Sequence, residues 1–166
     1  LEWYSATGGI GQNRNANNAA PALDSTGNLW TTMTDDAGGG TRTELRAVNS
    51  VSGVRLNAKN QNLPNGEVTD HTPPVIVDSA VYNAATAPAP GIPNDLVVVG
   101  ADGGGLGTDA GRLYAYDTVT NVQEWAINLD AGSHPRGIAV SPVDGFIYAG
   151  SSQGQLDRID PIDGSR

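Results

Sequence analysis

The sequence predicts an all-β fold made of repeated four-stranded units, and three observations support this. The chain has 22 Gly and 10 Pro among its 166 residues, which implies frequent turns and little long helix. Three segments align with one another, each an alternating strand that runs into a polar turn; they cover residues 45–53, 113–121 and 156–164. Two further short strands precede each segment, so the same order of elements recurs along the chain.

The expected strands fall into three units, at about residues 20–58, 74–129 and 137–164, with residues 1–6 added to the last unit. The strands expected before the aligned segments cover residues 20–23, 28–34, 74–77, 95–100, 137–140 and 145–150, and fourth strands are expected at 54–58 and 122–129. Four short strands joined by tight turns are typical of one blade of a β-propeller. We therefore expect residues 1–166 to form one propeller-like module or propeller segment of about three blades, one of them split between the N- and C-termini.

The middle unit is longer than the others because residues 82–94 are inserted into it. Pro88, Pro90 and Pro93 stand among small residues in this stretch, and proline cannot continue the interior of a strand. We expect an ordered or semi-rigid surface loop here.

Two units resemble known propeller repeats. The middle unit resembles the pyrroloquinoline-quinone-like (PQQ-like) repeat, which has a strand and turn of this kind followed by a tryptophan; the matching residues are Leu113, Tyr114, Ala115, Asp117 and Trp125. The last unit, from His134 and Pro135 through Ile147 and Tyr148, is similar to the YVTN repeat. The resemblance implies a quinoprotein-like propeller in which Trp125, and Trp3 in the same role, stack between blades. The dehydrogenases of that family hold their cofactor on a vicinal disulfide, and a chain without cysteine cannot form one, so we expect no cofactor.

The N-terminal strand stands apart from any unit before it. Leu1, Glu2, Trp3, Tyr4, Ser5 and Ala6 match the fourth strand of the middle unit, whereas the C-terminal residues from Ile162 to Arg166 follow a third strand. Two alternatives stay open. The chain is a piece of a longer propeller with further blades, or these ends pair with other copies and give a homo-oligomeric ring or filament, because an unpaired edge is a template for another strand.

Candidate metal ligands occur in the turns. His71 and His134 each stand shortly before a proline and an innermost strand. Asp35, Asp36, Asp102 and Asp109 lie in two Asp- and Gly-rich loops expected on the same face, and carboxylates with bare glycine carbonyls suit Ca²⁺. The alternative is that the histidines belong to structural turns and the aspartates to solvated hairpin loops, with no metal bound.

Charge and composition narrow the function. A formal net charge of -9 disfavours nucleic acid and anionic membranes as partners, and no apolar run is long enough for membrane insertion. The strands at 20–23, 74–77 and 137–140 carry almost only apolar or small residues, which argues against catalytic groups on a central channel. We expect a non-catalytic extracellular, cell-surface or periplasmic module with a structural or binding role. The alternative is a fragment of a larger propeller enzyme, either a lactonase-like hydrolase or a quinoprotein-like oxidoreductase.

Overall fold

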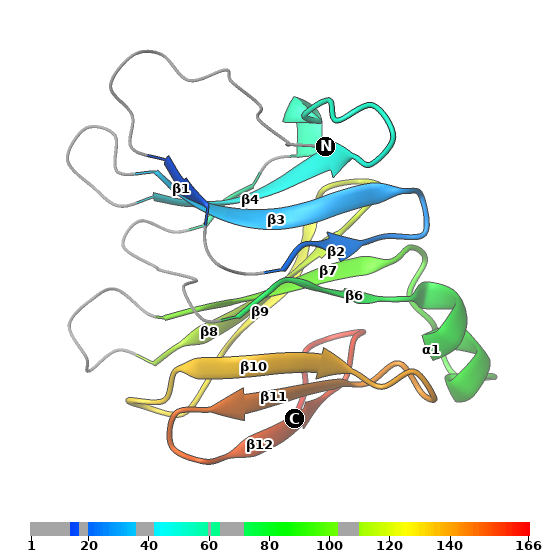
Figure 1. The fold of residues 1–166 in the computed structure, drawn as a ribbon. Coiled ribbons are helices and arrows are strands. Elements are labelled where there is room, and N and C mark those ends of the chain that lie inside the picture. The colour runs from blue at the N-terminus through cyan, green and yellow to red at the C-terminus, as the bar shows by residue number, and fades with distance from the viewer. Residues whose placement is uncertain (1–13, 17–19, 36–41, 60, 64–71, 103–109) are drawn as a thin grey trace.

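The computed structural model describes residues 14–16, 20–35, 42–59, 61–63, 72–102 and 110–166 (Figure 1). In this part the chain is all-β with one short α-helix, and its strands form three antiparallel sheets. The sheets lie face to face in the order of the chain, so that the second is covered by the first on one side and by the third on the other (Figure 1).

The strand order within each sheet is simple. The first sheet contains β1 (Arg14–Ala16), β2 (Ala22–Leu23), β3 (Asn28–Asp35), β4 (Arg42–Asn49) and β5 (Gln61–Asn62). These strands pair in the order β1-β3-β4-β5, and β2 also pairs with β3. The middle sheet contains β6 (Val75–Val77), β7 (Leu96–Ala101), β8 (Arg112–Asp117) and β9 (Gln123–Asn128), and the third contains β10 (Pro135–Val140), β11 (Ile147–Ser151) and β12 (Leu156–Ile159). In the middle and third sheets each strand pairs with the next one along the chain.

The same turn ends the strands β4, β8 and β12, and it explains why the three aligned segments look alike. The side chains of Asn49, Asp117 and Asp160 each accept a hydrogen bond from the backbone N–H two residues later. The fifth residue of each turn donates its N–H to the carbonyl of the first at 2.9 Å. That fifth residue needs a positive φ, which is supplied by Gly53, Gly164 and, at 61°, Asn121.

Alternation along β7 builds the two hydrophobic cores. Val97, Val99 and Ala101 point toward the first sheet and pack in a cluster with Trp30 and Leu45. The intervening Leu96 and Val98 point the other way, into a cluster with the aliphatic side chains of the third sheet. Both faces of the middle sheet are therefore buried.

The prediction of a loop over the whole of residues 82–94 is wrong for its first part. Residues Ser79–Thr86 form the helix α1, which begins after Asp78, whose carboxylate accepts hydrogen bonds from the N–H groups of Ala80 and Val81. The prolines that suggested a loop stand after the helix, where they cannot break it. Helix α1 lies at one end of the middle and third sheets (Figure 1). Its buried Tyr82 anchors it to the core between them.

The prediction of a fourth strand at residues 54–58 is also wrong. Arg55 makes only an isolated bridge to Val48, and residues Asn57–Lys59 turn into a short 3₁₀ helix before β5 pairs with Glu44 and Leu45. In addition, the repeats did not predict β1, which pairs with β3. The first sheet therefore departs from the regular pattern that the middle sheet follows.

Candidate functional site

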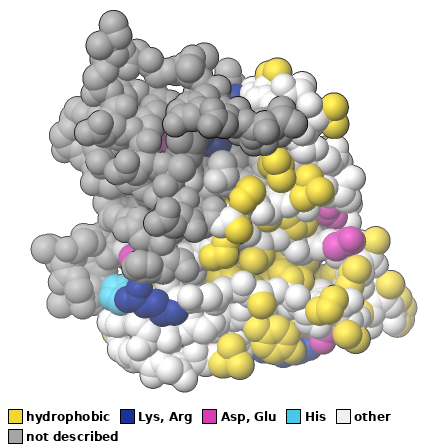
Figure 2. All heavy atoms as spheres, viewed as in Figure 1, with side chains coloured by type: hydrophobic (Ala, Val, Ile, Leu, Met, Phe, Trp, Pro, Cys, Tyr) yellow, Lys and Arg dark blue, Asp and Glu magenta, His cyan; other side chains and the backbone are white. Residues whose placement is uncertain are grey.

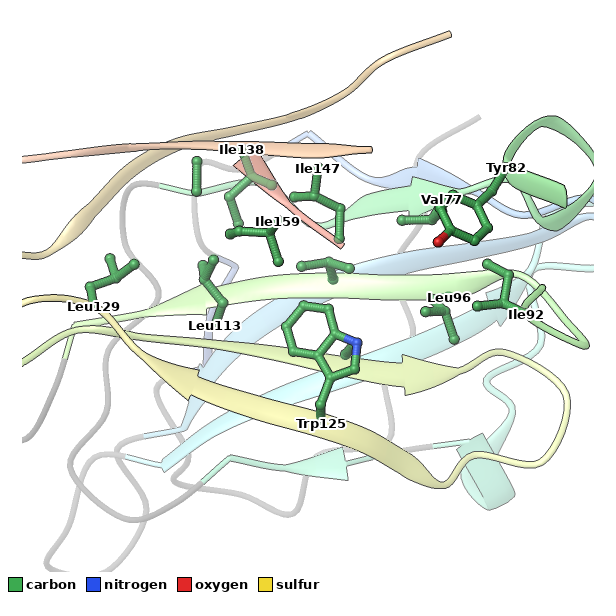
Figure 3. Packing of buried hydrophobic residues seen from close by; sticks show 13 residues of the cluster. Val77, Tyr82, Ile92, Leu96, Leu113, Trp125, Leu129, Ile138, Ile147 and Ile159 are labelled. Carbon is green, nitrogen blue, oxygen red and sulfur yellow. The ribbon is translucent and has the colours of Figure 1, made fainter. Parts of the chain in front are cut away.

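The contact between the middle and third sheets is built around Trp125. The indole rises from β9 toward the third sheet, between Leu113 and Leu96 and facing Ile159 (Figure 3). Its Nε1 donates to the carbonyl oxygen of Pro161 at 2.8 Å, and its ring lies against Gly164, where a Cβ would come within 3.0 Å of Trp125 Cδ2. The prediction that Trp125 packs between neighbouring units is confirmed; Trp3 lies outside the described residues.

Helix α1 closes one end of this contact. The hydroxyl of Tyr82 donates to Asp160 at 2.7 Å, and its ring meets Phe146 edge-on with centroids 5.5 Å apart. Burial, followed by the hydrogen bond to Asp160, raises the pKa of Tyr82, so the phenol stays protonated. Helix α1, which connects β6 to β7 in the middle sheet, is thus bound to the turn after β12, and the same turn accepts the hydrogen bond from Trp125.

The other end of the contact is formed by the lead-in segment, which we define as Ser133, His134 and Pro135 at the start of β10. It lies directly over two glycines of the middle sheet. A Cβ at Gly100 would stand 3.0 Å from Pro135 Cβ, and one at Gly111 would stand 2.5 Å from Pro135 Cδ. Gly111 also donates its N–H to the carbonyl of Ser133 at 2.7 Å. Only glycine allows this close approach of the two sheets.

His134 of the lead-in segment lies close to Asp102, which follows β7, so that the two side chains meet across the boundary between the two sheets. Their Oδ1 and Nδ1 atoms are 3.9 Å apart, and both side chains are partly exposed. The His134 Nδ1 atom is buried and has no hydrogen-bond partner among the described residues, and the same is true of Ser133 Oγ. The backbone N–H of His134 donates to Ser152 Oγ at 3.0 Å, which fixes the residue against the β11–β12 turn.

These two residues are the part of the candidate metal site that the structure places. Asp36, His71 and Asp109 lie outside the described residues, and the side chain of Asp35, at the end of β3, is not described. Within the described residues no group of three or more His, Cys, Asp or Glu side chains could hold a metal ion. One carboxylate and one imidazole are fewer than the six to eight oxygens that Ca²⁺ takes or the three or four ligands of zinc.

Within the described residues, the third sheet has one edge and one face that nothing covers. Its last strand, β12, pairs with β11, and none of the described residues forms a strand on its other side. Leu156 at the start of β12 is 72% exposed, whereas Leu113, the residue at the corresponding position of β8, is 0% exposed. The expected interaction residues 1–6 lie outside the described part of the chain.

The two remaining expected interaction residues lie near this edge. Ile162 is exposed on the turn after β12. Arg166 pairs with Asp130 at 3.1 Å and with Asp157 at 3.3 Å. Partial burial works against protonation, but these two carboxylates outweigh it and raise the pKa of Arg166. The C-terminal residues are thus held to the connection between β9 and β10 and to β12.

The contact between the first and middle sheets has a different character. Trp30 is fully buried there, and its Nε1 donates to Asp24 at 2.8 Å. Asp24 also accepts from Thr26 and Asn28; burial would raise its pKa, but these hydrogen bonds together lower it. At the outer edge Lys59 donates to the carbonyl of Thr118, and Gln61 donates to that of Asn121 at 2.7 Å. This edge is a polar seam.

Asp95 joins the same two sheets next to this seam, where its carbonyl oxygen accepts a hydrogen bond from the N–H of Thr118 at 3.0 Å. Its carboxylate accepts from the N–H of Ser25 in the first sheet and from the N–H and hydroxyl of Ser79 at the start of α1, each at 3.0 Å. Burial alone would raise the pKa of Asp95, but the hydrogen bonds outweigh burial and lower it. This role of Asp95 was not predictable from the sequence, because an aspartate directly before a strand is ordinary.

Exposed aliphatic side chains gather on the turns at the α1 end of the sheets. Val51, Val119 and Ile162 hold the same position in the three repeated turns, and Val143 extends the group on the β10–β11 turn; all are 40% exposed or more. Figure 2 shows hydrophobic side chains spread over the surface on this side of the molecule. The repeats determine where these residues stand, and nothing in the described residues covers them.

The described part of the chain belongs to the all-β class and consists of stacked antiparallel sheets. A tryptophan joins the sheets at one contact, and a polar seam joins them at the other. No protein-family model and no curated protein matches the chain. Within the described residues no helix has the length and apolar character needed to cross a membrane.

Proposed function

We propose that this chain is a non-catalytic β-propeller module with a structural or binding role, exported to the cell surface, the periplasm or the medium, that assembles by pairing strands between copies. The observation that carries the proposal is the difference between the middle and third sheets. The middle sheet has four strands, and its last strand delivers Trp125 to the next sheet. Among the described residues, the third sheet repeats only the first three of those strands, so the edge of β12 is available for a fourth.

The sequence at the N-terminus fits that edge. Residues 1–6 match the sequence of β9, and Trp3 corresponds to Trp125. Contributed by a second copy, this segment would add a fourth strand to the third sheet through backbone hydrogen bonds. Such a contact joins two different surfaces, so repeated copies give a ring when the rotation closes and a filament when it does not.

The alternative expectation, a fragment of a hydrolase or oxidoreductase, has less support. The pair formed by Asp102 and His134 is the only meeting of candidate metal ligands that the described residues contain, and it lacks the further ligands a catalytic metal requires. The absence of cysteine removes the disulfide on which the quinoprotein cofactor sits.

Light scattering after size exclusion tests the proposal. The intact chain should give a mass of at least twice 17.1 kDa, and deletion of residues 1–6 or the substitution Trp3→Ala should shift it toward the monomer. Val51→Ala, at an exposed turn, is the matched control and should leave the mass unchanged. A folded intact chain that is monomeric at every concentration would falsify assembly.

A further inference from the structure

Every buried carboxylate among the described residues serves the contact between the first and middle sheets. These carboxylates belong to Asp24, Asp95 and Asp117. Asp95 bridges the two sheets directly, because its carboxylate accepts the N–H of Ser25 from the β2–β3 turn and the N–H of Ser79 from the start of α1. A buried ionised carboxylate is unfavourable unless hydrogen bonds compensate it, so the contact depends on these bonds and on the charge that they stabilise.

Asp24 shapes the β2–β3 turn, from which Ser25 reaches over to the middle sheet. Its carboxylate accepts the backbone N–H groups of Thr26 and Asn28, each at 2.9 Å. It also accepts the indole N–H of Trp30, the residue that the first sheet buries against the middle sheet. Loss of the charge on Asp24 would therefore weaken both the turn and the anchoring of the indole, since hydrogen bonds to an ionised acceptor are the stronger kind.

Asp117 shapes the turn of the middle sheet between β8 and β9. Its carboxylate accepts the backbone N–H groups of Val119 and Thr120 and the side-chain amide of Asn94, each at 2.8 Å. The carbonyl groups of this turn receive the hydrogen bonds of the polar seam from the first sheet. Asn94 stands next to Asp95 in the chain, so the three carboxylates belong to one connected network.

Acid acts on the three carboxylates in the same direction. Burial would raise the pKa of each, but the hydrogen bonds together outweigh burial and lower it. The contact is therefore at full strength above the unfolded value of about 3.9 and weakens as the pH falls toward the lowered values. Each group that takes up a proton on opening can shift the equilibrium between the closed and open contact by up to about tenfold per pH unit.

The charges around the network do not replace the lost ones. The segments packed against Asp95 contribute Asp24, Asp78, Asp117 and Lys59 as ionisable side chains. Asp78 is exposed and caps helix α1, so its protonation acts on the helix rather than on the buried contact. Lysine keeps its charge in acid and would be left without the carboxylates that balance it.

The contact between the middle and third sheets has no buried carboxylate among the described residues. Its central hydrogen bond joins the indole of Trp125 to the carbonyl of Pro161, two groups that do not titrate. Asp160, which accepts the hydroxyl of Tyr82 at one end, is partly exposed. The ion pairs of Arg166 lie at the surface, where such pairs contribute little. Acid should therefore weaken one contact between sheets and spare the other.

We propose that the network of Asp24, Asp95 and Asp117 is an acid-released latch: protonation of these carboxylates frees the first sheet from the middle sheet, while the middle and third sheets stay joined. Release uncovers an apolar face of the middle sheet that includes Val97 and Val99. The inference does not depend on assembly between copies, because every group of the latch lies within one chain.

Two matched reporters test the latch, because the chain contains no cysteine and a single introduced thiol is unique. Ala47→Cys places a thiol in the contact between the first and middle sheets, and Ala149→Cys places one in the contact between the middle and third sheets. Both alanines are buried. Dithiodipyridine, a disulfide probe that reacts with thiols in acid, measures how often each thiol becomes accessible. Each rate is divided by that of the same variant unfolded in urea at the same pH.

We expect the rate for Ala47→Cys to rise at least about tenfold relative to that for Ala149→Cys between pH 7 and pH 3. Asp95→Asn, combined with each reporter, should raise the rate for Ala47→Cys already at pH 7 and reduce its dependence on pH. Asp163→Asn, which changes an exposed carboxylate on the turn after β12, is the matched control and should leave the ratio of the two rates unchanged.

Two outcomes overturn the latch. A ratio that stays constant as the pH falls would mean that the chain opens only as a whole, and a ratio that falls would mean that the third sheet separates first. Ala101→Cys and Ala115→Cys, on the two faces of the middle sheet, repeat the comparison if a thiol in an outer sheet prevents folding.

Discussion

The two contacts between sheets in this chain solve the same packing problem with different chemistry. The middle and third sheets are joined by the Trp125 indole, which fills a pocket of aliphatic side chains and donates one hydrogen bond to Pro161. The first and middle sheets bury Trp30, but they are also held together by the hydrogen bonds of Lys59 and Gln61 and by the carboxylate of Asp95 beside them. The first contact depends mainly on apolar burial and shape, whereas the second depends also on charge and on the geometry of its hydrogen bonds.

Of the substitutions that test this comparison, removal of Trp125 should change the free energy of unfolding most. Trp125→Ala should lower the free energy of unfolding by about 3–5 kcal/mol, because it empties the centre of the contact between the middle and third sheets. Urea denaturation followed by circular dichroism measures the change. Val119→Ala, on the exposed turn beside β9, should change it by less than about 0.5 kcal/mol. A small effect of Trp125→Ala would mean that this contact does not depend on the indole.

Two glycines on different faces sharpen the comparison. Gly100 lies in the contact between the middle and third sheets, and Gly150, which pairs with Leu156 as Gly100 pairs with Leu113, lies on the outer face of the third sheet. Gly100→Val should lower the free energy of unfolding by about 1–3 kcal/mol, since its side chain would collide with Pro135 and Thr72. Gly150→Val, at the equivalent but open position, should change it by less than about 0.5 kcal/mol in dilute monomer. Equal effects of the two substitutions in the same urea titration would refute the difference in packing between the covered Gly100 and the open Gly150.

The carboxylate of Asp95 should make the contact between the first and middle sheets sensitive to acid. Its pKa is lowered in the folded chain, so its stabilisation is complete above the unfolded value of about 3.9 and is lost as pH falls through the lower folded value. Asp95→Asn should therefore cost about 1–2 kcal/mol at pH 7 and less at pH 2.

Thermal melts of both proteins between pH 2 and pH 7 measure this difference. The gap between wild type and Asp95→Asn should narrow as the pH drops below about 4. A gap that stays constant over the whole range would show that the ionised carboxylate does not stabilise the contact.

The polar seam should give the smallest effect. Gln61→Ala removes a partly buried hydrogen bond to Asn121 and should cost about 0.5–1.5 kcal/mol in urea denaturation. Gln153→Ala removes a comparable bond to Ala131 that is fully exposed, so its cost should be smaller. The reverse order would mean that the seam contributes nothing beyond an ordinary surface contact.

Repetition made much of this fold predictable from the sequence. The Asn- or Asp-initiated turns fix where β4, β8 and β12 end, and the alternation of residues around them identifies the strands. Trp125 could be assigned to a contact between units because its position after the turn follows the same repeat. Local patterns of this kind are determined by residues close together in the chain.

The features that sequence reasoning missed depend on distant residues or on weaker local signals. Helix α1 was obscured by the prolines that follow it, although Asp78 before a run of small residues was a usable cap signal. The bonds of Asp95 to Ser25, and the meeting of Asp102 with His134, join residues from separate units. They follow from how the sheets stack, which no short segment specifies.

The position of the middle sheet has a consequence for how the molecule opens. Because β7 has a partner strand on each side and a packed sheet on each face, its amides should exchange with solvent only when the whole domain unfolds. The first and third sheets each pack against the middle sheet through one contact. We therefore expect that either outer sheet can separate while the other two sheets stay folded. The chain is thus a hierarchy in which the outer layers have separate, lower opening energies and the centre sets the global limit.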